Sequence, residues 1–145
     1  MDSLRIDTGE VRLCINDDPS RVIAFNPTDI SFAERFYGLL GEFEAKEKEY
    51  QEKAKALQRD TSVNEMGIPK NFGASLSLLR ETSDFLREKI DTVFGVGTSQ
   101  AAFGDANTLD MFEQFFTGIT PFVQKAREKQ VGKYTTKPAK RGALK

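Results

Sequence analysis

The sequence contains no histidine, no tryptophan and only one cysteine among its 145 residues. Histidine is the most frequent general base and the most frequent metal ligand, so its absence removes the main route to both kinds of site. Cys14 has no partner for an internal disulfide, and its place in an alternating segment predicts a small buried side chain. We therefore expect no catalytic, cofactor-binding or metal-binding residues, and a protein that acts by binding rather than as an enzyme.

Long apolar runs are also missing. No stretch reaches the 18 apolar residues of a membrane span, and the N-terminus has no basic segment followed by an apolar one. These absences predict no membrane partner, no secretory signal and a cytoplasmic location. The 30% charged and 39% hydrophobic residues, with twelve phenylalanines, are instead typical of a folded domain.

Charge is unevenly distributed along the chain. From residue 125 to the end there are eight basic residues and one acidic residue, Glu128, although the whole chain has a net charge of −1. Residues 1–124 therefore carry a net charge of −8. A basic end attracts phosphate or acidic groups, so a module that binds nucleic acid or an acidic partner is one alternative. The acidic body and the single stacking aromatic of this end, Tyr134, argue against nucleic acid.

Two short β-strands are expected near the N-terminus. Residues 10–16, EVRLCIN, alternate between apolar and polar side chains as a half-buried strand does. Residues 17–20, DDPS, are turn formers, and residues 21–25, RVIAF, predict a second strand. Residues 1–27 are therefore interpreted as a β-hairpin-like element.

Three longer segments, residues 28–59, 75–94 and 108–130, have the apolar periodicity of amphipathic helices. Thr28 or Asp29 is expected to cap the first of them. Its second half is rich in charge and poor in large apolar groups, so we expect it to project from the core or to pair with another chain.

The remaining segments define the domain organisation. Residues 60–74 contain two glycines and a proline and predict a turn. Beyond residue 130 the periodicity ends, which predicts a flexible basic tail over residues 131–145. The expected fold is mainly α, with three principal helices in residues 28–130, a β-hairpin-like start in residues 1–27 and a disordered basic tail.

A glycine-rich stretch, GVGTSQAAFG at residues 95–104, suggests at first a loop that binds phosphate. Such loops follow a strand and carry a lysine after the last glycine, whereas this stretch follows a helical pattern and contains no lysine. A turn between two helices explains the same residues, with Gly95 as a left-handed cap and Thr98 or Ser99 capping a short helical turn. The expected structural turn residues are Gly95, Gly97, Thr98, Phe103 and Gly104.

The segment 108–130 is unusually aromatic and has apolar side chains on more than one face. A three-helix body of this size cannot bury all of them, and surplus exposed aromatics mark a surface for another protein. We expect that surface, which also favours a homo-oligomer, to consist of Phe112, Phe115, Phe116, Ile119 and Phe122.

The same region carries a family resemblance. Phe94-Gly95, Gly97-Thr98-Ser99 and Phe103-Gly104-Asp105, followed by the helix with Phe112, Phe115 and Phe116, resemble the small tail assembly chaperones of long-tailed phages and prophages of Gram-positive bacteria. The resemblance covers residues 28–128, and its specific motifs lie within residues 93–116.

The resemblance implies a mostly helical protein without enzymatic activity in the host cytoplasm. It implies that the protein binds the tape-measure protein or tail tube subunits during assembly and is absent from the mature virion. In that family a translational frameshift often appends a second domain at the C-terminus. A structural tail component that stays in the virion remains an alternative, beside the module that binds nucleic acid or an acidic partner.

Overall fold

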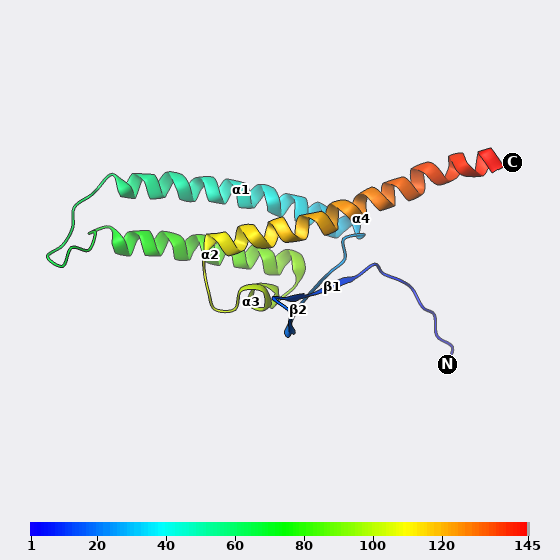
Figure 1. Ribbon diagram of the computed structural model, residues 1–145, viewed down its shortest axis with the longest axis horizontal. Helices are drawn as coiled ribbons and strands as arrows, with labels where there is room; N and C mark the ends of the chain where they lie inside the picture. The colour runs from blue at the N-terminus through cyan, green and yellow to red at the C-terminus, as the bar shows by residue number, and fades with distance from the viewer. Residues whose placement is uncertain (145) are drawn as a thin grey trace.

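The computed structural model describes the backbone of residues 1–144 and the side chains of residues 1–134. In chain order, the elements are β1 (Val11–Ile15), β2 (Asp18–Phe25), α1 (Ile30–Gln58), α2 (Phe72–Phe94), α3 (Thr98–Phe103) and α4 (Leu109–Leu144). The fold is mainly helical with a two-stranded antiparallel hairpin at its N-terminus, as the sequence predicted (Figure 1). None of the described helices is long and apolar enough to cross a lipid bilayer.

The turn of the β-hairpin is formed by Asn16 and Asp17, which have positive φ angles of 53° and 60°. Asparagine and aspartate tolerate this left-handed conformation, which matches the twist of a two-residue hairpin. The sequence pattern predicted a turn at residues 17–20, whereas β2 already begins at Asp18. The predicted turn therefore began one residue after the observed turn and ended three residues after it.

One face of the hairpin is apolar and covers the helices. Ile23 and Phe25 are buried there, and Leu13 pairs with Ile23 across the two strands. Cys14 lies on the opposite face and is exposed, so the prediction of a buried thiol was wrong. Because side chains alternate along a strand, the inward position of Leu13 requires its neighbour to face outward.

Helices α1 and α2 form an antiparallel helical hairpin (Figure 1). Asp29 caps α1 as predicted, because its carboxylate accepts a hydrogen bond from the backbone N–H of Ser31 at 3.0 Å. All buried residues of α1 lie in its first ten positions: Phe32, Ala33, Phe36 and Leu39. The second half of α1 and the start of α2 therefore project from the core, together with the loop of residues 59–71.

The first half of helix α4 packs against the other three helices. Aromatic pairs join it to each of the other helices: Phe43 with Phe116 at 4.6 Å between ring centroids, Phe94 with Phe115 at 5.2 Å, and Phe103 with Phe112 at 4.8 Å. Each fully buried phenylalanine stabilises the fold by roughly 1.5–3 kcal/mol. The core is thus an aromatic cluster centred on α4.

The second half of α4 leaves the body and carries the C-terminus away from it (Figure 1). A flexible tail was predicted over residues 131–145, which differs from the helical backbone that continues to Leu144. Once a helix has started, each added residue gains a hydrogen bond, and basic residues near its C-terminus interact well with its dipole. The side chains of residues 135–145 lie outside the described part of the chain.

Candidate functional site

The glycine-rich stretch joins α2 to α4 through α3, as predicted. Gly97 lies in the left-handed region, with φ 92° and ψ −8°, and Gly104 ends α3 with φ 61°. Gly95 has φ 121° and ψ 150°, so it is not the left-handed cap that the sequence suggested. Thr98 and Phe103 are buried. These five residues form an architectural corner.

The start of α3 is held by a side chain from α2. The carboxylate of Asp91 accepts hydrogen bonds from the backbone N–H of Ser99 at 2.8 Å and from its hydroxyl at 3.1 Å. The prediction that Thr98 or Ser99 supplies the capping side chain was therefore wrong. An acidic group at a helix N-terminus satisfies exposed amides, and here that group comes from a neighbouring helix.

The end of α3 is held by a side chain from the hairpin. Arg21 of β2 donates hydrogen bonds to the carbonyl groups of Ala101 and Ala102, at 2.8 and 2.7 Å. The last carbonyls of a helix have no partner within the helix and carry partial negative charge, so a guanidinium group stabilises them. Arg21 thus ties the β-hairpin to the corner.

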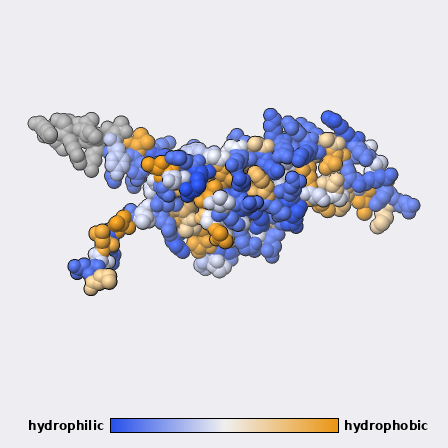
Figure 2. Space-filling view, turned by 180° about the vertical axis from the view of Figure 1, so that it is seen from behind, coloured by the Kyte–Doolittle hydropathy of each residue, from blue (hydrophilic) through white to orange (hydrophobic). Residues whose placement is uncertain are grey.

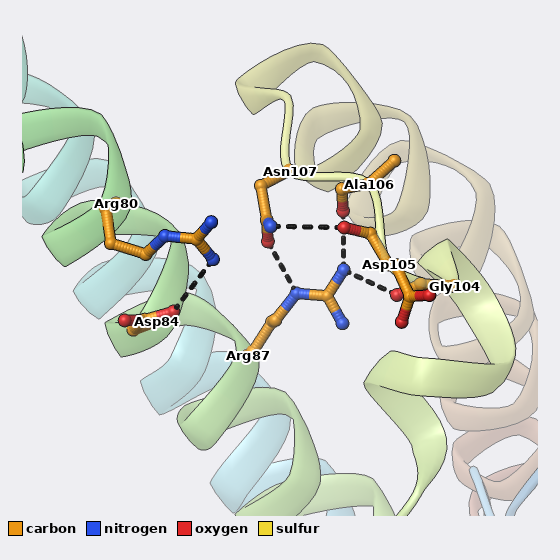
Figure 3. Close-up of polar contacts among 7 residues, drawn as sticks. All are labelled: Arg80, Asp84, Arg87, Gly104, Asp105, Ala106 and Asn107. Atoms are coloured by element: carbon orange, nitrogen blue, oxygen red, sulfur yellow. Dashed lines mark hydrogen bonds and ion pairs between the residues drawn. The ribbon is translucent and has the colours of Figure 1, made fainter. Parts of the chain in front are cut away.

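A second arginine holds the loop that leads into α4 (Figure 3). Arg87 of α2 donates to the side-chain oxygen of Asn107 and to the carbonyl of Gly104, both at 2.8 Å. Nearby on the same helix, Arg80 makes only an exposed ion pair with Asp84 at 3.8 Å. The polar groups of the corner are therefore used within the fold.

The predicted partner-binding residues separate into two groups. Phe112, Phe115, Phe116 and Ile119 belong to the buried core, with exposed fractions of 8% or less. The prediction that these four form an exposed surface was wrong, because the β-hairpin and α3 add cover that a three-helix body lacks. Phe122 is different, since 40% of it remains exposed.

Phe122 lies in a groove between α4 and the N-terminal segment, which we call the α4 groove. Its volume is about 540 Å³. Val11, Pro27 and Ala126 line it beside Phe122, and the ring of Phe122 packs edge-on against Phe25 with 6.2 Å between centroids. The floor of the groove is therefore apolar and continuous with the core.

One wall of the α4 groove is basic. Lys125, Lys129 and Lys133 follow one another at four-residue spacing, which places them along one side of α4. Within the part of the chain whose side chains are described, no carboxylate lies within 4.0 Å of any of these three ammonium groups. The amine of Lys133 instead lies 5.5 Å from the ring centroid of Tyr134. These lysines leave their charge available to a partner.

The opposite wall is the N-terminal segment, which is anchored at Thr8 and Gly9. The carbonyl of Thr8 accepts hydrogen bonds from the side chains of Asn26 and Thr28. Gly9 has φ 82°, and a Cβ atom there would lie 2.4 Å from the hydroxyl oxygen of Thr28. Only glycine fits this position without a shift of its neighbour.

Residues 1–6 extend beyond this anchor into solvent. Leu4 and Ile6 are 84% and 74% exposed. Figure 2 shows hydrophobic side chains on this projecting arm.

A second exposed apolar area lies at the far end of the α1–α2 hairpin. We call it the tip patch, and it consists of Val63, Met66, Ile68, Phe72 and Leu76. None of these five residues is charged, whereas three lysines line the α4 groove. Among the described residues, no group of three or more cysteine, aspartate or glutamate side chains is arranged to hold a metal ion.

The fold and the α4 groove define a small helical protein with an apolar and basic surface groove. Residues 20–145 match the model of a family described as Family of unknown function (DUF6673), and the chain belongs to this family. No curated protein and no solved structure matches the chain. The matched region begins within β2 and contains the whole of α4, whereas the N-terminal arm and β1 lie outside it.

The alignment of the three lysines was not predicted from the sequence. Lys125 and Lys129 fell within the predicted helix 108–130 and Lys133 within the predicted tail. All three were counted only toward the basic charge of the C-terminal end, although their four-residue spacing matches the helical period. No sequence pattern indicates the role of Gly9, because its close approach to Thr28 exists only in the folded chain.

Proposed function

We propose that the protein is a non-catalytic phage tail assembly chaperone. It binds a segment of the tape-measure protein or of the tail tube protein in the host cytoplasm, and it is absent from the mature virion. The observation that carries this proposal is the α4 groove, where a partly exposed phenylalanine and an apolar floor lie beside three lysines that have no carboxylate partner among the described side chains.

The resemblance to tail assembly chaperones supports the proposal through the corner. Phe103 is buried against Phe112, and Gly104 provides the positive φ angle that ends α3. These residues therefore account for the arrangement of the helices. The choice of client depends on residues outside this motif, which is why the α4 groove matters more than the corner for function.

The groove suits a transient client. A partner that places two or three apolar side chains on Phe122 and its neighbours gains roughly 1.5–3 kcal/mol for each one that is fully buried. Part of that gain offsets the freedom lost on association. The net affinity is modest, which agrees with a protein that must release its client during assembly.

The lysines also favour a second candidate, a module that binds an acidic partner. Lys125, Lys129 and Lys133 line the same groove as Phe122, so an acidic client satisfies both candidates. A structural tail component differs in its fate rather than in its surface. Its presence in purified virions would favour that alternative.

The proposal is tested by co-expressing the tagged protein with candidate tape-measure and tail tube proteins, followed by affinity capture. We expect capture of at least one of them and a marked loss with Phe122→Ser. The matched control is Val96→Ser, because Val96 is fully exposed and lies at the corner, away from the groove. Failure of the parent protein to capture either tail protein would contradict the proposal.

A further inference from the structure

We propose that the α4 groove binds an acidic protein segment that also carries apolar side chains. This inference rests on the proposed function, because that segment belongs to the client. It adds the chemistry by which the client is chosen. Three features of the groove support it: the aligned lysines, the apolar floor and the presence of one aromatic side chain, Phe122, in its lining.

The lysines give the first argument, through charge complementarity. Lys125, Lys129 and Lys133 are exposed, and no described carboxylate neutralises them. From Lys125 to Lys133 the helix rises by about 12 Å, which is a little more than two turns. A partner helix with acidic residues at four-residue spacing presents its carboxylates at the same intervals.

The floor gives the second argument, because charge alone does not explain an apolar cavity. Phe122, Val11, Pro27 and Ala126 line the groove below the lysines. An acidic segment without apolar groups would leave this floor in water. A segment with an apolar stripe beside its carboxylates covers the floor and neutralises the wall at the same time.

The aromatic content of the groove distinguishes a protein segment from a nucleic acid. Asp7 also lines the groove, but its carboxylate repels phosphates and carboxylates alike. Nucleic acids bind through successive stacking aromatics along a basic track, whereas Phe122 is the aromatic side chain among the residues that line this groove. The observations therefore favour an acidic peptide over a single strand of DNA or RNA.

The test uses a fluorescently labelled synthetic helical peptide of glutamate, leucine and alanine, with glutamates at four-residue spacing. Binding to the full chain is measured by fluorescence anisotropy at about 0.1 M salt and again at about 1 M, where the Debye length falls from about 10 to 3 Å. We expect saturable binding that weakens in high salt. Replacing the glutamates by glutamine should weaken it at low salt as well.

The matched variants separate the groove from the general charge of the protein. Lys125→Gln, Lys129→Gln and Lys133→Gln together should weaken the peptide about tenfold, because each exposed pair contributes up to a few-fold in affinity. The control triple replaces lysines that lie on α1 and in the loop before α2 and should bind as the parent does: Lys48→Gln, Lys55→Gln and Lys70→Gln. All six are exposed, so both triples should retain the circular dichroism spectrum of the parent.

Several outcomes overturn the inference. These are no binding of the peptide, equal loss in both triples, or equally tight binding of polyglutamate or single-stranded DNA. Affinity capture of tail proteins separates this failure from that of the proposed function. If the groove triple still captures a tail protein normally, the inference fails and the chaperone function stands. If the parent captures none, that function fails, while the peptide titration still decides the chemistry of the groove.

Discussion

The two halves of α4 differ in the burial and in the charge of their side chains. From Leu109 to Val123, one side of the helix is aromatic and buried against the hairpin and the other helices, with Phe112 and Val123 fully buried. Beyond Val123, the helix leaves the body and carries basic side chains beside a groove. Phe122 lies at the boundary and belongs partly to each half.

This difference shows that aromatic content alone does not locate a binding surface. The most aromatic stretch of the chain holds the fold together, and the candidate site begins where that stretch ends. We therefore expect binding residues where apolar surface remains accessible beside charged side chains, as at Phe122. Substitutions in the buried half should therefore act on stability, and those beyond it on binding.

The largest expected effect is in the buried half. Phe112→Ala should lower the free energy of unfolding by about 3–5 kcal/mol, because it removes a fully buried ring and leaves a cavity. Phe122→Ala should lower it by only about 1 kcal/mol, because this ring is partly in water already. Urea denaturation followed by circular dichroism measures both. Equal losses of stability would contradict the distinction between the two halves of α4. If Phe112→Ala does not fold, Phe112→Leu replaces it in the comparison.

The next effect concerns the loop that leads into the buried half. Arg87→Ala should lower the free energy of unfolding by about 1.5–3 kcal/mol, because it leaves the carbonyl of Gly104 and the side chain of Asn107 without their charged donor. Arg80→Ala removes only an exposed ion pair and should change it by about 0.5 kcal/mol or less. Thermal unfolding of the two variants compares them directly, and similar losses would contradict the role of Arg87.

A smaller effect tests the wall opposite the lysines. Gly9→Ala and Gly67→Ala both place a side chain at a φ angle near 80°, which costs about 1–2 kcal/mol locally. Only at Gly9 does the new Cβ atom also meet Thr28, since the position of Gly67 is open. We expect Gly9→Ala to weaken binding of the acidic peptide and Gly67→Ala to leave it unchanged. Equal affinities would show that this wall takes no part.

The smallest effect lies in the projecting half of α1. The pKa of Glu49 is lowered, chiefly by its hydrogen bond with Lys53 at 2.8 Å and also by the charge of Lys46. A lowered folded pKa means that the pair stabilises the helix above the unfolded pKa and stops doing so as pH falls through the folded pKa. Amide hydrogen exchange around Glu49 should therefore accelerate, relative to its intrinsic rate, as the carboxylate is protonated. Glu49→Gln should remove that pH dependence, and its persistence would assign it to another group.

Much of the fold was predictable because it depends on local patterns. The alternation before residue 16 gave the first strand, Asp29 gave the start of α1, and the glycines gave the corner. The sequence pattern of α4 shows apolar residues on two sides of the helix. It does not show which of these sides is covered by another element of the fold. That cover comes from residues distant in the sequence, such as Phe25 and Phe43.

The candidate site was only partly predictable for the same reason. Phe122 was included among the expected partner residues, but four core residues were included with it. The groove needs Val11 and Pro27, which approach Phe122 only after the hairpin folds onto α4. The three lysines were considered only as part of the basic charge of the C-terminal end, whereas their position on a helix beside an apolar floor gives them their proposed role.

Hydroxyl-radical footprinting with and without a captured tail protein tests the account most directly, because it reports the accessibility of individual side chains. In the free protein Phe122 and Met66 of the tip patch should react readily and Phe112 should be protected. The account predicts that the tail protein lowers the reactivity of Phe122 and leaves that of Met66 and Phe112 unchanged. Protection of Met66 with Phe122 still reactive, or high reactivity of Phe112 in the free protein, would contradict it.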